Sequence, residues 1–216
     1  MPVATTRMMT SAKASGFLAI WSDVDPADET DYLHWLTREH VQERLAVPGF
    51  SAVRVFRAEA EGRGRFLIFY RLQNPGIVGS GEYLERLNAP SPWSQRIMPK
   101  LKNFIRGGGR IVQETGSGEG MYAAPILFER EKLQPYLAAA SEIAGADRIA
   151  AARVFEVDQA ASEIQTNEKA MREGDRTFEA MMLLESLDEN MLALGLKFLE
   201  VRDRSIYRQI FSLANV

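Results

Sequence analysis

The chain has 216 residues, of which 46% are hydrophobic and 25% charged, and its net charge is −3. These values are typical of a globular protein with a sizeable core, and the lack of a basic excess argues against a nucleic-acid partner. There is no cysteine, which excludes disulfides, thiolate zinc sites and cysteine nucleophiles and is compatible with the cytoplasm, where we expect the protein. No segment is apolar and long enough for a secretion signal or a membrane span, so we expect no membrane partner.

The first half of the sequence has the order strand, helix, two strands, helix, strand. Residues 1–15 are expected to be a flexible N-terminus, and FLAIWSDV (17–24) is apolar throughout, as in a strand covered on both faces. Residues 25–47 have helical spacing and end at a Pro-Gly pair. Two strands, FSAVRVFRAEA and RFLIFYRLQ, flank a short turn; residues 80–104 form a helical region broken by two prolines, and RGGGRIVQE supplies the fourth strand. This βαββαβ order is that of the ferredoxin-like unit.

A second unit with the same order follows the linker TGSGEG (115–120), so we divide the chain into repeat 1 (16–114) and repeat 2 (121–216). The tripeptide Arg-Val-Phe stands at the same point of each unit, beginning at Arg54 and at Arg153. One unit alone would leave an apolar sheet face uncovered, and two units can bury these faces against each other. The sequence therefore predicts an α+β protein in which two tandem ferredoxin-like repeats close into one intramolecular, dimeric-type α/β barrel.

The hairpin of repeat 2 contains a polar and charged insertion at about 158–176. We expect it to be a solvated loop, and the alternatives are a flap over a pocket or a dimer contact.

The helix predicted over residues 25–47 has two polar side chains on its apolar face. On a helical wheel, His40 and Arg44 lie one turn apart within the arc of Leu33 and Leu36. Burying an imidazole and a guanidinium is unfavourable unless polar groups meet them, which favours a wet or ligand-filled pocket under this helix. In it, His40 would act as a general base or hydrogen-bond donor, and Arg44 would hold a carboxylate, phenolate or enolate.

The alternative for both side chains is structural. His40 would then bond a buried carbonyl, and Arg44 would pair with Glu39, Glu43 or Asp23. His34 points away from His40 on the same wheel, so the two histidines of the chain do not form a zinc site on one helix face, and we expect no metal.

Further residues are candidates for lining this pocket. We expect Trp21, Leu36, Arg54, Phe69 and Trp93 to be its substrate-binding residues, and core packing is the alternative for the large rings. For Arg54 we favour a salt bridge in the barrel, because the second unit repeats this arginine.

The segment HWLTREHVQERLAVPGFSAVRVFRA, followed by FLIFYRLQNP and SPWSQRIMPKLKNFIRGGGRIV, resembles the dimeric α/β-barrel superfamily. Within it, the segment is similar to EthD-like and related uncharacterised bacterial proteins. The likeness covers roughly residues 16–113, and the second half lacks the EH and PGF motifs. The resemblance implies a ferredoxin-like barrel with a pocket between helices and sheet. The superfamily includes cofactor-free monooxygenases, lactone isomerases, polyketide cyclases, haem-dependent peroxidases and chlorite dismutases, so the resemblance implies a fold more than a reaction.

Three functional hypotheses follow. The first is a cofactor-independent enzyme of monooxygenase, isomerase or cyclase type, with His40 and Arg44 as its catalytic residues. Its substrate would be a small aromatic or polyketide-like compound. The second is a non-catalytic ligand-binding or structural barrel, and the third is a haem-binding protein. The expected partner is a small hydrophobic or aromatic molecule, and the chain would be a monomeric barrel or a homodimer.

Overall fold

The structure, a computed structural model, describes residues 6–8, 15–59, 64–201 and 203–215. Within these ranges nine strands form one sheet. They are β1 (Thr6–Met8), β2 (Gly16–Val24), β3 (Phe50–Ala58), β4 (Gly64–Leu72), β5 (Lys102–Thr115), β6 (Tyr122–Phe128), β7 (Ile149–Val157), β8 (Ala180–Ser186) and β9 (Tyr207–Ala214). Of the expected flexible N-terminus, residues 1–5 and 9–14 lie outside the described residues, and β1 pairs with the end of β5.

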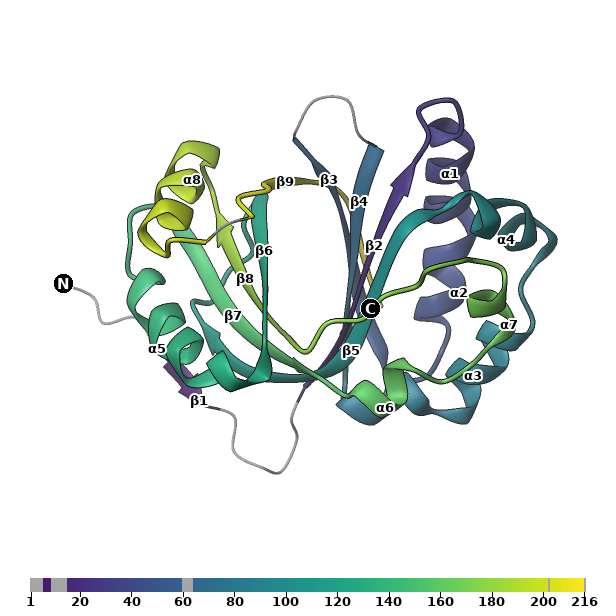
Figure 1. The fold of residues 1–216 in the computed structure, drawn as a ribbon, viewed down its shortest axis with the longest axis horizontal. Coiled ribbons are helices and arrows are strands. Elements are labelled where there is room, and N and C mark those ends of the chain that lie inside the picture. The colour runs from purple at the N-terminus through teal and green to yellow at the C-terminus, as the bar shows by residue number, and fades with distance from the viewer. Residues whose placement is uncertain (1–5, 9–14, 60–63, 202, 216) are drawn as a thin grey trace.

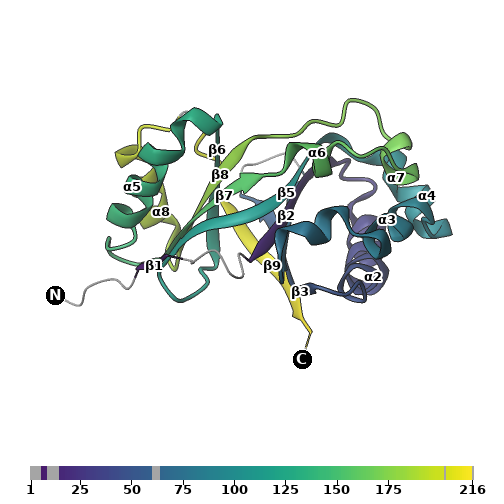
Figure 2. The ribbon, with the colours of Figure 1, turned by 90° about the horizontal axis from the view of Figure 1, so that it is seen from below.

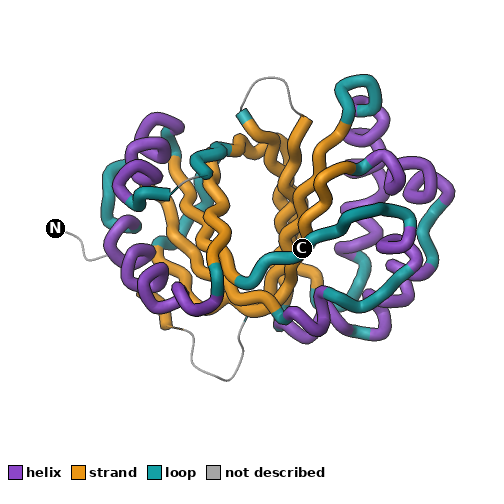
Figure 3. The backbone as a smooth tube through the Cα atoms, in the orientation of Figure 1, coloured by secondary structure: helices purple, strands orange, loops and turns teal. Residues whose placement is uncertain are grey.

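Both halves of the chain arrange their strands in the same order. The hydrogen-bonded order is β5-β2-β4-β3 in the first half and β9-β6-β8-β7 in the second. Two antiparallel ladders join the halves, one between β3 and β9 and the other between β5 and β7. With these ladders, eight of the described strands close into a barrel (Figure 3). The expected α+β barrel is confirmed.

Helices cover the barrel on two opposite sides (Figure 1). On the first half these are α1 (Glu29–Trp35), α2 (Val41–Leu45), α3 (Gly81–Asn88) and α4 (Pro92–Ile97), and on the second half α5 (Leu133–Ile143) and α8 (Glu189–Phe198). The serine hydroxyls of Ser80 and Ser91 cap α3 and α4 by accepting hydrogen bonds from backbone N–H groups three residues on. Pro92 occupies the first turn of α4, where an N–H is not needed.

Side-chain alternation along the strands separates the barrel interior from the outer layers. On β2, Phe17 and Trp21 belong to the interior cluster, whereas Leu18 and Ile20 pack with the helices of the first half. Both halves contribute rings to the interior, and the ring centroids of Phe17 and Phe155 are 4.8 Å apart. The two halves of the sheet therefore bury their inner faces against each other in one shared core.

The glycine run RGGGR lies inside β5, where the barrel closes. Gly109 pairs with Val157 of β7, and a Cβ atom on Gly109 would lie only 2.2 Å from the carbonyl oxygen of Glu156. Glycine is required here because the two backbones approach too closely for any side chain.

The inserted segment of the second half packs on the first half. We call residues 158–177 the arm; it contains α6 (Gln159–Ser162) and α7 (Asn167–Ala170) and runs beside the helices of the first half (Figure 2). Asn167 makes two hydrogen bonds to Asn88 at the end of α3. The backbone of Arg176 exchanges hydrogen bonds with that of Phe104 and Arg106 on β5. The arm is therefore attached to the first half at its middle and near its C-terminal end, in contrast to the solvated loop expected from its composition.

Candidate functional site

One helical segment carries the two polar residues that the sequence places on an apolar face. It consists of α1, a π-helical turn over Leu36–His40, and α2, which follow one another directly. Single π-helical turns within α-helices are rare and often occur at functional sites. His40 ends the π turn, and Arg44 lies one helical turn further. Both are buried, with 4% and 2% of their surface exposed.

His40 and Arg44 border a cavity of about 380 Å³ between the first half's helices, its sheet and the arm. The floor is the outer face of β2 and β4, with Ile20, Ser22 and Ile68. Aromatic rings form much of the walls, namely those of Tyr32, Trp35, Tyr83 and Phe104. The arm supplies the remaining wall from the second half of the chain, so the cavity depends on both halves.

His40 is held as a neutral base. Its ring lies against that of Trp35, with a centroid separation of 4.3 Å, and the Trp35 Nε1–H donates to the Ser94 hydroxyl at 3.1 Å. Burial lowers the pKa of His40 well below its ordinary value, and the positive charges of Arg44 and Arg172 lower it further. A neutral imidazole is the form that accepts a proton.

Arg44 is half paired. Its Nη2 group forms an ion pair with the buried Glu168 carboxylate of α7, and the guanidinium lies 5.9 Å from the ring centroid of Tyr83. Its Nη1 group has no partner. One side of the guanidinium is therefore occupied by the arm, and the Nη1 group on the other side is buried without a partner.

The partner of Arg44 differs from those considered from the sequence. Asp23 instead pairs with Arg65 at 2.5 Å, and Glu39 accepts a hydrogen bond from Ser91 at 2.5 Å. Glu168 could not be identified because it belongs to the other half of the chain, and local spacing does not report such a contact.

Three buried polar atoms lack a hydrogen-bond partner among the residues that the structure describes. They are His40 Nδ1, Arg44 Nη1 and the Tyr70 hydroxyl oxygen. Burial raises the pKa of Tyr70, so its hydroxyl remains protonated. Buried polar groups are nearly always hydrogen-bonded in native proteins, and each exception needs an explanation. Two of the three atoms belong to cavity-lining residues, and a polar ligand would satisfy them.

Three further arginines, Arg106, Arg172 and Arg176, border the cavity, and none of them was predicted from the sequence. Arg172, on the arm, pairs with Asp175 at 2.9 Å and lies 3.8 Å from the ring centroid of Phe104. Arg106, on β5, donates to the carbonyl oxygen of Ser162 at 3.3 Å and to the Tyr83 hydroxyl at 3.4 Å. In the sequence, each of them is an arginine within an otherwise apolar or turn-rich segment. Arginines in such segments are also common on protein surfaces, so the sequence does not distinguish these residues.

The five residues expected to bind substrate do not line this cavity. Trp21 and Phe69 face the barrel interior, because their strand positions have the opposite parity to those of the cavity floor. Leu36 is fully buried in the helix–sheet core. Trp93 lies on α4, where its Nε1–H donates to Asp31 at 3.0 Å. The helical wheel predicted correctly that Leu36 lies on the buried face of its helix. The cavity, however, occupies only part of the space below that face, and Leu36 does not line it.

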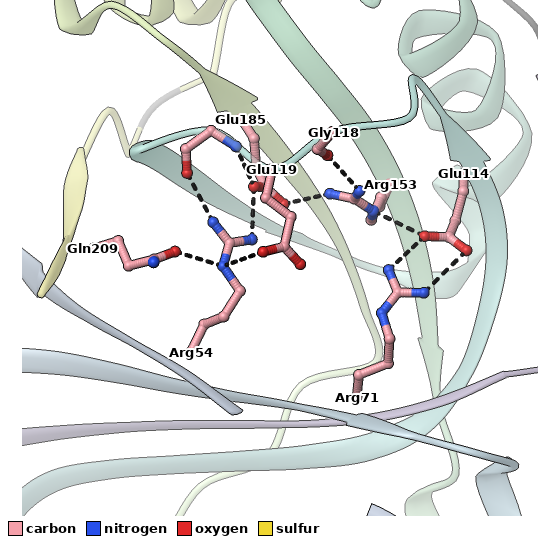
Figure 4. A network of polar contacts seen from close by, with 9 residues as sticks. Arg54, Arg71, Glu114, Gly118, Glu119, Arg153, Glu185 and Gln209 are labelled. Atoms are coloured by element: carbon pink, nitrogen blue, oxygen red, sulfur yellow. Dashed lines mark hydrogen bonds and ion pairs between the residues drawn. The ribbon is translucent and has the colours of Figure 1, made fainter. Parts of the chain in front are cut away.

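Arg54 lies at one end of the barrel, in the salt bridge that we favoured. It donates to Glu185 at 2.7 Å, to Gln209 at 2.6 Å and to the carbonyl oxygen of Gly120 at 2.7 Å (Figure 4). Gly120 belongs to the expected linker, so this arginine also holds the connection between the halves.

Neither a metal cluster nor a membrane-spanning helix is seen in the described part of the chain. Groups of three or more histidine, cysteine, aspartate or glutamate residues that could hold a metal are absent from the described residues. Among the helices of the same residues, none has the length and apolar character to cross a bilayer.

Comparisons with known proteins identify the fold of this chain through solved structures. No model of a protein family matches the sequence, and neither does any curated protein. Among solved structures, an anthrone oxidase-like protein matches with a TM-score of 0.60 at 10% identity, over 94% of this chain and 94% of that chain. A candidate monooxygenase of Lactobacillus acidophilus matches with a TM-score of 0.54 at 7% identity, over 93% of this chain and 96% of that chain. A second candidate monooxygenase, of Fusobacterium nucleatum, matches with a TM-score of 0.53 at 8% identity, over 94% of this chain and 96% of that chain.

Identities this low carry a fold and no activity. The matches nevertheless extend over nearly the whole of each chain, so they include both halves and the barrel that these form. The protein therefore has the dimeric α/β-barrel fold, with both halves of the barrel in one polypeptide.

Proposed function

We propose that the protein is a cofactor-independent enzyme that removes a proton from a small aromatic or polyketide-like compound in the cavity beside His40. One observation carries the proposal: a buried, neutral histidine and a half-paired arginine border the same cavity, and each has a polar atom without a partner. The names of two fold neighbours, a candidate monooxygenase and an anthrone oxidase-like protein, support a monooxygenase type of reaction.

His40 is the proposed general base. It would take a proton from an acidic C–H or O–H group of the substrate, and its lowered pKa keeps it in the accepting form at neutral pH. The resulting enolate or phenolate oxygen would receive a hydrogen bond from Arg44 Nη1. A guanidinium N–H in a site shielded from water stabilises developing negative charge strongly.

In the oxygenase form of this chemistry, the substrate anion reacts with dioxygen. One dioxygen molecule converts an activated CH₂ group to a carbonyl group; one oxygen atom enters the product, and the other leaves as water with the two hydrogens. The step needs no external reductant, because the substrate supplies all the electrons. Isomerisation or cyclisation would use the same proton transfer without dioxygen.

The surroundings of His40 do not suit a haem. A haem site is a broad and mostly apolar slot beside an exposed ring nitrogen of the axial ligand. Here Trp35 covers one face of the imidazole, and the charged Arg44 and Arg172 lie close enough to lower its pKa. We therefore base the proposal on the side chains alone.

The test is the oxidation of a hydroxylated anthrone in air-saturated buffer. The reaction is measured as dioxygen uptake and as the absorbance of the quinone that forms. We expect one dioxygen consumed per quinone formed. The H40Q variant should lower kcat about 100-fold or more, while KM changes much less. The matched control is H34Q, because His34 is the other histidine of the chain and is exposed.

Equal turnover in H40Q and the wild type would contradict the role of His40. Ligand binding without any turnover would favour the non-catalytic alternative, a small-ligand-binding barrel. We further propose the cytoplasm as the location, since the chain has no cysteine. Because one polypeptide already supplies both halves of the barrel, we expect the monomer to be sufficient for activity.

A further inference from the structure

Glu168 brings a buried negative charge from the arm to the wall of the cavity. It lies on α7 with 6% of its surface exposed, and its carboxylate pairs with Arg44 Nη2. A glutamate is rarely this buried unless it is paired. The pairing joins a residue of the second half to the proposed catalytic helix of the first.

The charges of Arg44 and Arg172 are each balanced by a carboxylate of the arm. Glu168 offsets Arg44, and Asp175 offsets Arg172, whose Nη2 and Asp175 Oδ2 are 2.9 Å apart. A ligand that reaches Arg44 therefore meets an Arg44–Glu168 ion pair that has no net charge. The Nη1 group of this pair has no hydrogen-bond partner. That geometry suits a single neutral oxygen.

A carboxylate ligand would be at a disadvantage at this point. An unpaired guanidinium binds a carboxylate through two parallel N–H groups. Here one side of the guanidinium is already taken by Glu168, and a carboxylate ligand would bring a net second negative charge beside it. Like charges brought together at a binding site cost several kcal/mol. The enolate or phenolate of the proposed reaction differs, because it forms together with a protonated His40 and leaves the net charge of the site unchanged.

We propose that Glu168 determines substrate specificity: it makes the cavity accept neutral phenols and ketones and reject aromatic carboxylates. This inference rests on the proposed function, since it specifies the charge of the substrate at the same site. Glu168 acts through Arg44 and is a positioning residue, so its test needs a readout that a structural role would not change.

The experiment compares two probes with the same ring system, 1-naphthol and 1-naphthoate, by isothermal titration calorimetry at neutral pH. The wild type should bind the neutral naphthol, and naphthoate at least about 10-fold more weakly. The E168Q variant should bind naphthoate at least about 10-fold more tightly than the wild type does, because the Arg44 fork is then free. Its affinity for naphthol should change by no more than about threefold, since Nη1 remains available.

The matched control is E163Q, which removes the same charge from the rim of the cavity on the same arm. Glu163 is exposed and lines the cavity, so E163Q should keep the wild-type ratio of the two affinities. A merely structural role of Glu168 would weaken both probes together.

A second variant covers the case in which E168Q does not fold. E168D keeps the charge but draws the carboxylate away from Arg44 by one methylene group, and it should show a smaller gain in naphthoate affinity. Naphthol binding with an unchanged affinity ratio in E168Q, or in E168D if E168Q is unfolded, would overturn the specificity role alone. Failure of every variant to bind either compound would overturn the proposed function as well.

Discussion

Arg54 and Arg153, the first residues of the repeated Arg-Val-Phe tripeptides, donate to the two oxygens of a single carboxylate. Arg54 Nη1 lies 2.7 Å from Glu185 Oε2, and Arg153 Nη1 lies 2.5 Å from Glu185 Oε1. Glu185 is fully buried. The two arginines also bind the carbonyl oxygens of Gly120 and Gly118, so the connection between the halves is fixed by the same guanidinium groups.

Replacing Glu185 should therefore destabilise the barrel strongly. E185Q leaves two buried guanidinium groups without their shared anion, and breaking a buried ion pair costs about 3–5 kcal/mol. Urea unfolding of E185Q measures the loss. The control is E119Q, because Glu119 lies 3.4 Å from Arg54 but its side chain is 54% exposed, and it should change stability by less than about 1 kcal/mol. Similar losses in both variants would contradict a special role of Glu185.

The repeated arginines show what the sequence could establish about the fold. The order of elements and the Arg-Val-Phe repeat indicated the barrel, because strand and helix periodicity are local and the uncovered sheet faces required each other. The linker TGSGEG is rich in glycine, a composition that is typical of a flexible connection. Its carbonyl groups are instead hydrogen-bonded by Arg54 and Arg153, and composition does not report such tertiary contacts.

The candidate site was predicted only in part, for a similar reason. Helical spacing placed His40 and Arg44 on the buried side, and both border the cavity. Their neighbours Glu168 and Arg172 belong to an insertion of the second half whose polar composition indicated solvent. Strand residues such as Phe69 were assigned to the wrong side of the sheet, since a fully apolar strand gives no signal for which side each residue faces.

Acidification should destabilise the protein through His40. Its pKa in the folded state is well below the ordinary value of 6.5 because of burial, Arg44 and Arg172. Below pH 6.5 the unfolded chain binds a proton that the folded chain does not, so the free energy of unfolding falls as the pH decreases from 6.5 toward the lower folded pKa.

Denaturant unfolding between about pH 7 and pH 5 tests this contribution, which is bounded by about 1.4 kcal/mol per pH unit. The loss of stability should be smaller in H40Q than in the wild type, and H34Q should retain the wild-type dependence. An H40Q variant with the full wild-type loss would show that other groups account for it.

Gly109 should tolerate no side chain. In G109A the new Cβ would approach the Glu156 carbonyl oxygen to 2.2 Å, and forcing the β5–β7 ladder apart should cost about 1–3 kcal/mol or more. The matched change is G81A, since a Cβ at Gly81 in the first turn of α3 meets no atom within 4 Å. G81A should be neutral or stabilising by up to about 1 kcal/mol. Thermal unfolding of the two variants should therefore shift in different directions or by clearly different amounts.

Tryptophan fluorescence can report occupancy of the cavity. Trp35 lines it, whereas Trp21 faces the barrel interior and Trp93 lies on α4. An aromatic ligand such as 1-naphthol should change the emission of the wild type, W21F and W93F, and this change should be lost in W35F. A response that persists in W35F and disappears in W21F would place the ligand inside the barrel instead.

The arm makes the two halves of this molecule unequal. In a barrel assembled from two identical subunits, every substitution occurs twice, and a loop that covers one site must cover both. Here a single polypeptide supplies a cover from one half to a cavity in the other. Each half is thereby free to specialise, and a mutation in residues 158–177 can alter the chemistry of the opposite half without changing a residue there.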